Sequence, residues 1–426
     1  MPSALTRTTL ANGLRVVVHE DHSAPSVGIA VYYDVGFRSE PEGRTGFAHL
    51  FEHLMFQGSA HVGKMEHPRL VQGAGGVMNG STHPDFTNYY QAVPSNAVDL
   101  TLWLEADRMR SPAVTEENLA NQVAVVQNEI RVNVMNRPYG GFPWIVLPPV
   151  AFDTFPNAHN GYGDFSELEA ATVEDCQDFF RRYYAPGNAV LGISGDVDPD
   201  AVLTTVETYF GDIPKRRTPK RQSFAEPPVT SERRGEVIDA HASAPAFAVG
   251  WRGPDPAREP EAHLAAVVLA EVLAEGDASR LQQRLLLTDR TAISAEAYLG
   301  TFGDPFEQRD PMLFTVSVTH APGVDGELVL AATQEEIDRV ATDGLAGGEL
   351  ERVVARLRAQ LLRQRDQTIG RTLALTQFEQ QHGRAELLWE TDDRVAAVTA
   401  EQVRAVAGSL THVSRSVLSL RAGATS

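Results

Sequence analysis

Two ten-residue stretches decide the predicted fold, HLFEHLMFQG at residues 49–58 and VVLAEVLAEG at residues 267–276. Each has apolar residues at helical spacing and ends in glycine, so each predicts a buried helix that stops at that glycine. With the two glycines superposed and one gap introduced, His49 and His53 of the first stretch fall on valines of the second. The pattern indicates two related halves, of which only the first carries these polar side chains.

The similarity extends to other segments in the same order. Residues 22–31 (HSAPSVGIAV) match residues 241–249 (HASAPAFAV), and residues 117–129 (ENLANQVAVVQNE) match residues 348–360 (GELERVVARLRAQ). Between the halves, residues 213–236 contain four prolines and a cluster of basic residues, which is typical of a linker. We therefore predict two similar domains, 1–214 and 236–426, joined by residues 215–235.

Strand and helix patterns alternate along the first half. Short runs of β-branched and aromatic residues predict strands, and apolar residues three and four apart predict helices. The predicted strands are 13–19, 26–35, 86–93 and 190–193, and the predicted helices are 45–57, 97–109 and 116–136. This mixture predicts an α+β fold in which helices cover a mixed, largely antiparallel sheet in each domain.

Composition and charge limit the class of protein. The 426 residues include 37 Lys and Arg against 56 Asp and Glu, and the net charge of −19 disfavours binding to nucleic acid or an anionic membrane. The single cysteine, Cys176, excludes a disulfide framework, and its acidic neighbours argue against a reactive thiolate. The sequence has no signal-peptide pattern and no apolar run long enough to span a bilayer, so we expect a soluble, cytoplasmic protein.

The helix predicted at residues 47–56 carries three ionisable side chains on one face. Apolar residues cover most of its circumference, and His49, Glu52 and His53 share a wedge of about 100°. Burying such groups without partners is costly, and one metal ion satisfies all three. Imidazoles four residues apart can share a tetrahedral zinc ion, with Glu52 close enough to take a proton from a water that the metal activates. Core histidines satisfied by other partners are the alternative.

A catalytic zinc site usually has three protein ligands and one open position. In the predicted helix 116–136, Glu129 and Gln122 lie seven residues apart on the flank of the apolar stripe. A half-buried carboxylate there needs a partner, so Glu129 is the candidate third ligand. An ordinary ion pair on the helix flank is the alternative.

The inverted motif His49-Leu-Phe-Glu52-His53, followed 76 residues after His53 by Glu129, resembles the pitrilysin-like (inverzincin) metallopeptidases, which include mitochondrial processing peptidases and bacterial relatives. Further stretches are similar to this family: FEHLMFQGSAHVG, GAGGVMNGSTHPDFTNYYQAVP, WLEADRM, VVQNEIR, NRPYG and YYAPGNAVLGISGDVDP. The resemblance covers the first half densely and the second half more loosely. It implies two similar domains that form a clamshell around a closed chamber.

The resemblance also implies an activity and roles for the motif residues. His49, His53 and Glu129 would bind zinc, and Glu52 would be the general base in the hydrolysis of unfolded or short peptides. A non-catalytic scaffold subunit of the same fold is the alternative. Three further histidines near the motif, His61, His67 and His83, are expected to lie exposed in loops.

Four other positions bear on the activity. Asn79 matches a family position that contacts the substrate backbone, on a strand expected to pair with an extended peptide. Gln122 stands where a second glutamate is often found, and its amide would hydrogen-bond to a metal ligand. Family members usually have an Arg and a Tyr, seven residues apart, where this chain has Leu286 and Ile293. The resemblance therefore implies a zinc-bearing subunit that works with a homologous Arg/Tyr-bearing partner, with a homodimer as the alternative.

Overall fold

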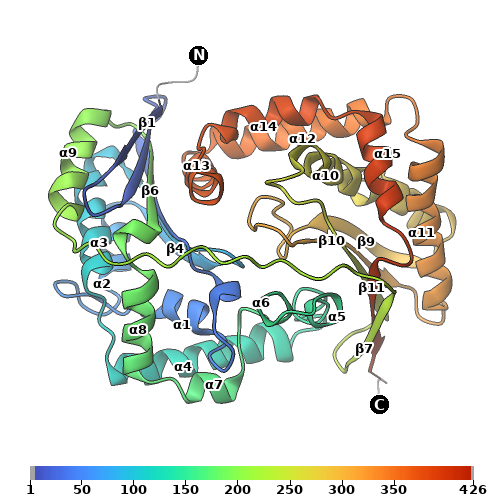
Figure 1. The fold of residues 1–426 in the computed structure, drawn as a ribbon, viewed down its shortest axis with the longest axis horizontal. Coiled ribbons are helices and arrows are strands. Elements are labelled where there is room, and N and C mark those ends of the chain that lie inside the picture. Colours follow the sequence, from blue (N-terminus) through green and yellow to red (C-terminus); the bar gives the residue numbers. More distant parts are fainter. Residues whose placement is uncertain (1–4, 424–426) are drawn as a thin grey trace. The chain divides into compact units, whose positions relative to one another are not determined.

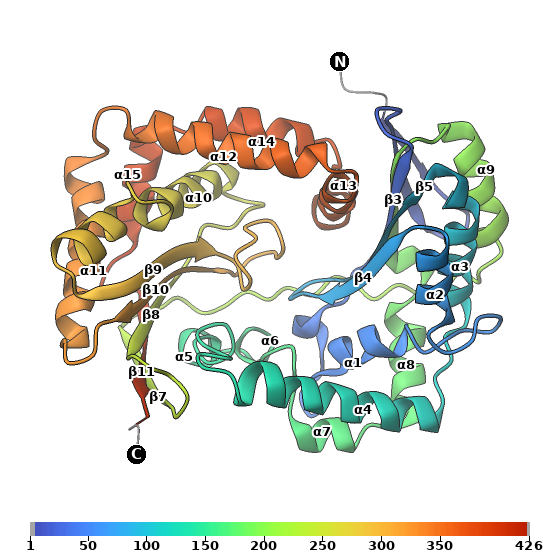
Figure 2. The ribbon, with the colours of Figure 1, turned by 180° about the vertical axis from the view of Figure 1, so that it is seen from behind.

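The computed structural model describes residues 5–423, which divide into two compact units (Figures 1 and 2). Unit 1 consists of the described residues up to Asn128 together with Gly161–Ser223 and Leu362–Glu390. Unit 2 consists of Glu129–Asn160, Phe224–Leu361 and the described residues from Thr391 onward. Each unit therefore contains a segment from the other half of the chain, whereas the predicted domains 1–214 and 236–426 are continuous.

The sheet of unit 1 has six strands among the described residues, in the spatial order β1-β2-β6-β3-β5-β4. The strands are β1 Leu5–Thr9, β2 Arg15–Glu20, β3 Ser26–Tyr33, β4 Val77–Thr82, β5 Thr87–Pro94 and β6 Ala189–Gly195. β2 and β6 run parallel, and the other neighbouring pairs are antiparallel. β4 pairs with β5 and forms an edge of the sheet.

Unit 1 contains helices from both halves of the chain, and several of them pack on its sheet. They are α1 Phe47–Leu54, α2 Glu66–Gly73, α3 Val98–Arg110, α4 Glu116–Ile130, α7 Phe165–Glu169, α8 Val173–Tyr183, α9 Pro199–Phe210 and α13 Thr368–His382, with short 3-10 helices η1 Phe37–Ser39, η2 Ser95–Ala97 and η4 Pro186–Asn188. α13 packs on β3 and β6. A Cβ atom at Gly192 of β6 would lie 1.8 Å from Thr376 Oγ1, so this glycine lets α13 approach the sheet closely.

The sheet of unit 2 repeats this topology. Its five described strands follow the order β7-β11-β8-β10-β9, with β7 and β11 parallel and the others antiparallel. They are β7 Arg233–Asp239, β8 Ala246–Arg252, β9 Ala292–Leu299, β10 Leu313–His320 and β11 Arg415–Ala422. With β1 set aside and the strands numbered within each unit, both sheets have the order 1-5-2-4-3. The predicted α+β fold of two similar domains, each with a mixed and largely antiparallel sheet, is confirmed.

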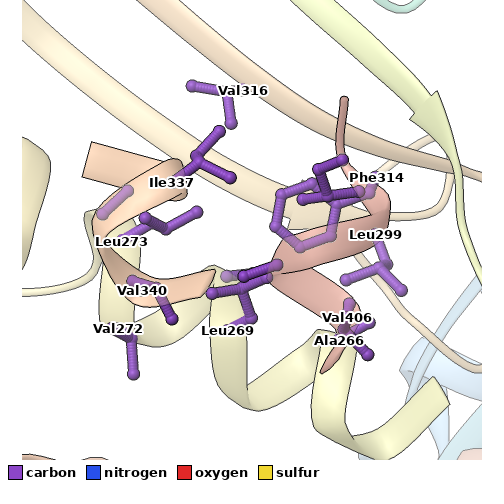
Figure 3. Packing of buried hydrophobic residues seen from close by; sticks show 14 of the residues in the cluster. Ala266, Leu269, Val272, Leu273, Leu299, Phe314, Val316, Ile337, Val340 and Val406 are labelled. Atoms are coloured by element: carbon purple, nitrogen blue, oxygen red, sulfur yellow. The ribbon is translucent and has the colours of Figure 1, made fainter. Parts of the chain in front are cut away.

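The core of unit 2 lies between its sheet and the helices that pack on it. Its helices are α5 Pro148–Ala151, α6 Phe155–Ala158, α10 Pro260–Ala274, α11 Gly326–Asp343 and α15 Ala400–Ser409, with π-helical segments η3 Arg131–Met135 and η5 Gln282–Thr288. α12 Glu349–Asp366 and α14 Leu387–Ala396 extend across the division between the units. Figure 3 shows Leu269 and Leu273 of α10 and Ile337 of α11 packed near Phe314 and Val316 of β10. This apolar packing holds α10 against the sheet.

Three local expectations differ from the structure. His83 was expected to be exposed, but it is half-buried and its ring stacks on that of Phe86 with centroids 4.3 Å apart. The helix predicted at residues 116–136 is α-helical as far as Ile130 and then continues as the π-helical segment η3. His67 was expected to be exposed, which is wrong: it belongs to α2, is 5% exposed, and its Nε2 lies 4.0 Å from Glu105 Oε1. Within residues 5–423, no helix is both long and apolar enough to cross a membrane.

Candidate metal centre

Helix α1 is held by contacts at its N-terminus. Glu40, 3% exposed, accepts hydrogen bonds from the backbone N–H groups of Gly46 (2.9 Å) and Ala48 (2.7 Å). A carboxylate at this position satisfies orphan donors and interacts favourably with the helix dipole. Gly46 has φ 82°, and a Cβ atom there would lie 2.6 Å from the carbonyl oxygen of Tyr162. The start of α1 is therefore fixed by a buried acid and by a glycine that no other residue replaces without strain.

The structure brings His49, His53 and Glu129 together. All three are half-buried, and one possible ligand atom from each lies within 4.8 Å of the other two. The Nε2 atoms of the two histidines are 3.2 Å apart. Two ligands at about 2.0–2.1 Å from a tetrahedral zinc ion would be separated by about 3.3 Å, so the histidine spacing fits zinc closely.

The third member of this group comes from α4. Glu129 is the first residue assigned to unit 2, but it belongs to a continuous helix whose residues 116–128 are in unit 1. The rigidity of one α-helix therefore positions the carboxylate. Two imidazoles and one carboxylate are a donor set typical of catalytic zinc sites, so the residues present fit this metal.

Aromatic contacts orient the histidine rings. The rings of His49 and His53 are nearly perpendicular, with centroids 4.8 Å apart. Tyr162 makes a second edge contact with His49 at a centroid distance of 5.1 Å and an interplanar angle of 76°. Edge-to-face packing of this kind restricts ring rotation and keeps the ligand nitrogens directed to the same point.

Glu52 has a partner that the sequence analysis missed. The hydroxyl of Thr82, the last residue of β4, donates a 2.6 Å hydrogen bond to Glu52 Oε2. Alternation along β4 puts Thr82 on the same face as Gly80, and a Cβ atom at Gly80 would lie 3.3 Å from Phe56. The alternation was available from sequence, but the docking of α1 on that face was not. The hydrogen bond holds the carboxylate of the candidate base in one orientation.

Asn79 and Gln122 occupy different surroundings. Asn79 is an exposed residue of the edge strand β4, and its Oδ1 accepts a hydrogen bond from Gly80 N at 2.9 Å. Gln122 is buried in α4, and its amide donates to Asn121 Oδ1 at 2.8 Å. The hydrogen bond found for Gln122 thus goes to a neighbour in the same helix. Their proposed roles, in binding substrate and in supporting a metal ligand, stay predictions.

The positions where an Arg and a Tyr were expected hold apolar side chains in unit 2. Leu286 lies in the π-helical segment η5 and packs against the core of that unit. Ile293 lies on β9 and is 56% exposed. Neither side chain donates a hydrogen bond, so neither can stabilise a developing oxyanion.

Unit 2 has no metal ligand set at the position that corresponds to α1. The two valines aligned with the histidines, Val268 and Val272 of α10, are fully buried in the apolar core. Glu271, aligned with Glu52, forms an ion pair with Arg356 of α12. Burial raises the pKa of Glu271, whereas Arg356 acts in the opposite direction. In this unit, the glutamate aligned with Glu52 is therefore satisfied by an ion pair.

Comparisons with known proteins give a consistent family. Residues 15–139 match a model described as "Insulinase (Peptidase family M16)", and residues 170–357 match one described as "Peptidase M16 inactive domain". The chain is 28% identical over 422 residues to an uncharacterized zinc protease of Streptomyces coelicolor, covering 94% of this chain and 86% of the relative. It is 26% identical over 357 residues to the zinc protease PqqE of Helicobacter pylori, covering 83% and 78%.

A solved structure shares the fold. The crystal structure of a protease from Helicobacter pylori superposes with a TM-score of 0.90 at 22% sequence identity, covering 98% of this chain and all of that one. The two M16 models match the halves of the chain in order, and the relatives are zinc proteases along nearly its whole length. The resemblance to pitrilysin-like metallopeptidases is confirmed, and the chain belongs to the M16 peptidase family.

Proposed function

We propose that this chain is a zinc-dependent endopeptidase that hydrolyses unfolded or short peptides. The observation that carries the proposal is that possible ligand atoms of His49, His53 and Glu129 lie within 4.8 Å of one another. The helix that carries the two histidines, α1, also carries Glu52. Its relatives in Streptomyces and Helicobacter are named zinc proteases, which supports the same chemistry here.

Different residues of the chain have different roles in the proposed amide hydrolysis. Zinc bound by the two histidines and Glu129 would supply Lewis acidity, which polarises the scissile carbonyl and makes water a better nucleophile. Glu52 accepts the proton of the attacking water and returns it to the leaving amine. Thr82 holds Glu52 in place during both transfers. The exposed edge of β4, with Asn79, pairs with the extended backbone of the peptide.

A partner subunit completes this proposal. Because Leu286 and Ile293 supply no hydrogen-bond donor, the chain alone lacks one means of stabilising the oxyanion. The loss of one such donor lowers the rate by about 10²–10³-fold in other hydrolases. We infer that a homologous chain bearing an Arg and a Tyr supplies these groups in a heterodimer; a homodimer would leave the deficit in place. Full peptide turnover by the purified chain alone would contradict the heterodimer.

A scaffold subunit without catalysis is the second candidate. The apolar residues at 286 and 293 favour it, as does the match of residues 170–357 to an inactive domain. Metal analysis separates the two candidates, because a scaffold has no need for three converging ligands. Absence of zinc after purification from a zinc-replete medium would favour the scaffold.

The test of the peptidase combines zinc content with peptide cleavage, each measured on the same preparations. Glu52→Gln is expected to retain about one zinc per chain and to lose hydrolysis, because its amide cannot take a proton. His49→Ala and Glu129→Ala are expected to lose zinc, because two ligands bind zinc much more weakly than three.

The matched control is His61→Ala, which removes a histidine that is 68% exposed and bonded to Asp107. This variant is expected to keep the parental zinc content and activity. Cleavage by Glu52→Gln at the parental rate would refute the assignment of the base. Retention of zinc by both ligand variants would refute the metal site.

A further inference from the structure

Unit 2 contains a cleft of about 730 Å³ beside its edge strand β9. Its lining consists of residues 142–144, the end of α10 and the turn after it at residues 274–277, Gln282, and residues 294–298 and 301–303 of β9 and the next loop. The aromatic side chains in its lining are Phe142, Trp144, Tyr298 and Phe302. The rings of Trp144 and Phe302 are in contact, with centroids 5.6 Å apart. The cleft therefore has a wall of aromatic surface from two distant segments.

The loop after β9 is fixed by buried side chains. Glu307, fully buried, accepts a 2.7 Å hydrogen bond from Phe302 N. Gln308, also buried, accepts from Thr301 N at 3.1 Å and donates to Pro311 O at 2.9 Å. These bonds hold Phe302 in place before any ligand arrives, and a preformed site loses little entropy on binding.

The charged residues in the lining of the cleft are all acidic. Glu275, Asp277 and Glu296 line it, and none of the described lining residues is Lys, Arg or His. Glu275 is paired with Arg356 at 3.0 Å, whereas Asp277 and Glu296 are exposed acids on the turn after α10 and on β9. Burial raises the pKa of Tyr298, and the carboxylates of Glu296 and Glu307 raise it further. The lining carboxylates, and not the burial of Tyr298, therefore favour a positive charge at this place and disfavour a negative one.

We propose that this cleft binds the cationic side chain of an arginine or lysine in a peptide. A guanidinium or ammonium group is attracted to the faces of aromatic rings and to carboxylates, and both surround the same space. The alkyl stem of either side chain would cover the remaining apolar wall. The inference rests on the proposed peptidase function, to which it adds a preference for peptides with a basic residue. It assigns the recognition of that residue to side chains of unit 2 that are not among the candidate metal ligands.

The test measures binding without turnover, by titrating the full-length Glu52→Gln variant with three unstructured peptides. They differ at one central position, which is arginine, norleucine or glutamate. The change in fluorescence of Trp144, identified by comparison with Trp144→Leu, and the heat of binding report on the cleft. The arginine peptide is expected to bind about tenfold more tightly than the norleucine peptide, with a preference that falls as salt rises.

Two variants, each of which removes one negative charge, test whether the arginine peptide binds in this cleft. Glu296→Gln is expected to reduce the arginine preference to about threefold or less, because it removes an acid from the lining. Asp343→Asn, at an exposed acid outside the lining, is expected to leave the preference intact. Equal binding of the arginine and norleucine peptides would overturn the proposal. So would an equal effect of Glu296→Gln and Asp343→Asn.

Because the test measures binding and not cleavage, the cationic site and the peptidase proposal can fail separately. If the parent protein cleaves no peptide but Glu52→Gln shows the arginine preference, the peptidase proposal fails and the cationic site stands. If the parent cleaves peptides and no preference is found, the cationic site fails and the peptidase proposal stands.

Discussion

Replacing Thr82 with valine tests how the candidate base is positioned. The substitution removes the hydroxyl and keeps a β-branched side chain of similar shape at the end of β4. The lost contact is the 2.6 Å hydrogen bond from Thr82 Oγ1 to Glu52 Oε2, a length typical of bonds to an ionised acceptor. Hydrogen bonds to charged groups contribute about 1.5–3 kcal/mol.

This energy sets the expected loss of rate. Each 1.36 kcal/mol corresponds to a tenfold change in rate. If the whole energy of this hydrogen bond stabilises the transition state, its loss lowers kcat by about 10- to 150-fold. Water can replace part of the lost contact at a half-buried site, so we expect a value near tenfold. KM is expected to change by less than about twofold, because Thr82 holds the base and not the peptide.

The assay is steady-state cleavage of a quenched fluorescent peptide, with zinc content measured on each sample. Thr82→Ser keeps the hydroxyl and is expected to recover activity to within about threefold of the parent. Thr82→Val with the parental kcat would refute a positioning role. Loss of zinc from Thr82→Val would show instead that the residue supports α1 as a whole.

Three further predictions concern stability and reactivity. Gly192→Ala would put a Cβ atom 1.8 Å from Thr376 Oγ1, so it should destabilise the protein by about 1–3 kcal/mol in urea unfolding, with partial recovery on adding Thr376→Ala. Burial raises the pKa of Cys176 to about 12, so the native thiol should resist an aromatic disulfide reagent at pH 8 and react once urea unfolds the chain; rapid native labelling would contradict this. Burial lowers the pKa of His67 well below its usual value, so the unfolded chain binds more protons than the folded one and the free energy of unfolding should fall as the pH drops below about 6.5. His67→Gln should reduce that fall by up to about 1 kcal/mol between pH 6.5 and 5.5. An unchanged dependence of stability on pH in this variant would refute the prediction.

The local part of the candidate site was predictable from sequence. Imidazoles four residues apart on one helix must share a face, so His49 and His53 follow from helical geometry alone. Glu129 is different, because helical periodicity could place it on a helix flank but could not say which other helix faces that flank. Its place on the helix flank made it a candidate ligand, the family resemblance favoured it over an ordinary ion pair, and the structure brings it within reach of both histidines.

The parts that sequence reasoning missed depend on contacts between distant segments. Glu40 caps α1 across a loop, and nothing in its own neighbourhood marks it as a buried acid. His67 was expected to be exposed because it was placed in a loop, whereas it belongs to α2. The structure buries it beside Glu105 and Arg108, an ion pair of α3 that polar composition alone cannot reveal.

The placement of α13 is the clearest case of a long-range contact. Its residues belong to the second half by sequence order, yet they pack on the central strands of unit 1. Arg371 of α13 forms an ion pair with Asp21 at 2.7 Å and donates to Ser194 Oγ at 2.9 Å. Such matches between a helix and a sheet some 180 residues away leave no periodic signal in either segment.

The comparison of the two units separates what the fold needs from what the chemistry needs. Both sheets have the same strand order, so this topology forms in unit 2 with valines where unit 1 has histidines. Apolar packing is therefore sufficient to hold the equivalent helix, and the fold itself gives no reason to keep half-buried ionisable groups on α1. In unit 2, the glutamate at the position of Glu52 is neutralised by Arg356. In unit 1, the corresponding face stays polar and converges with Glu129, an arrangement that the proposed zinc ion requires and that apolar packing does not.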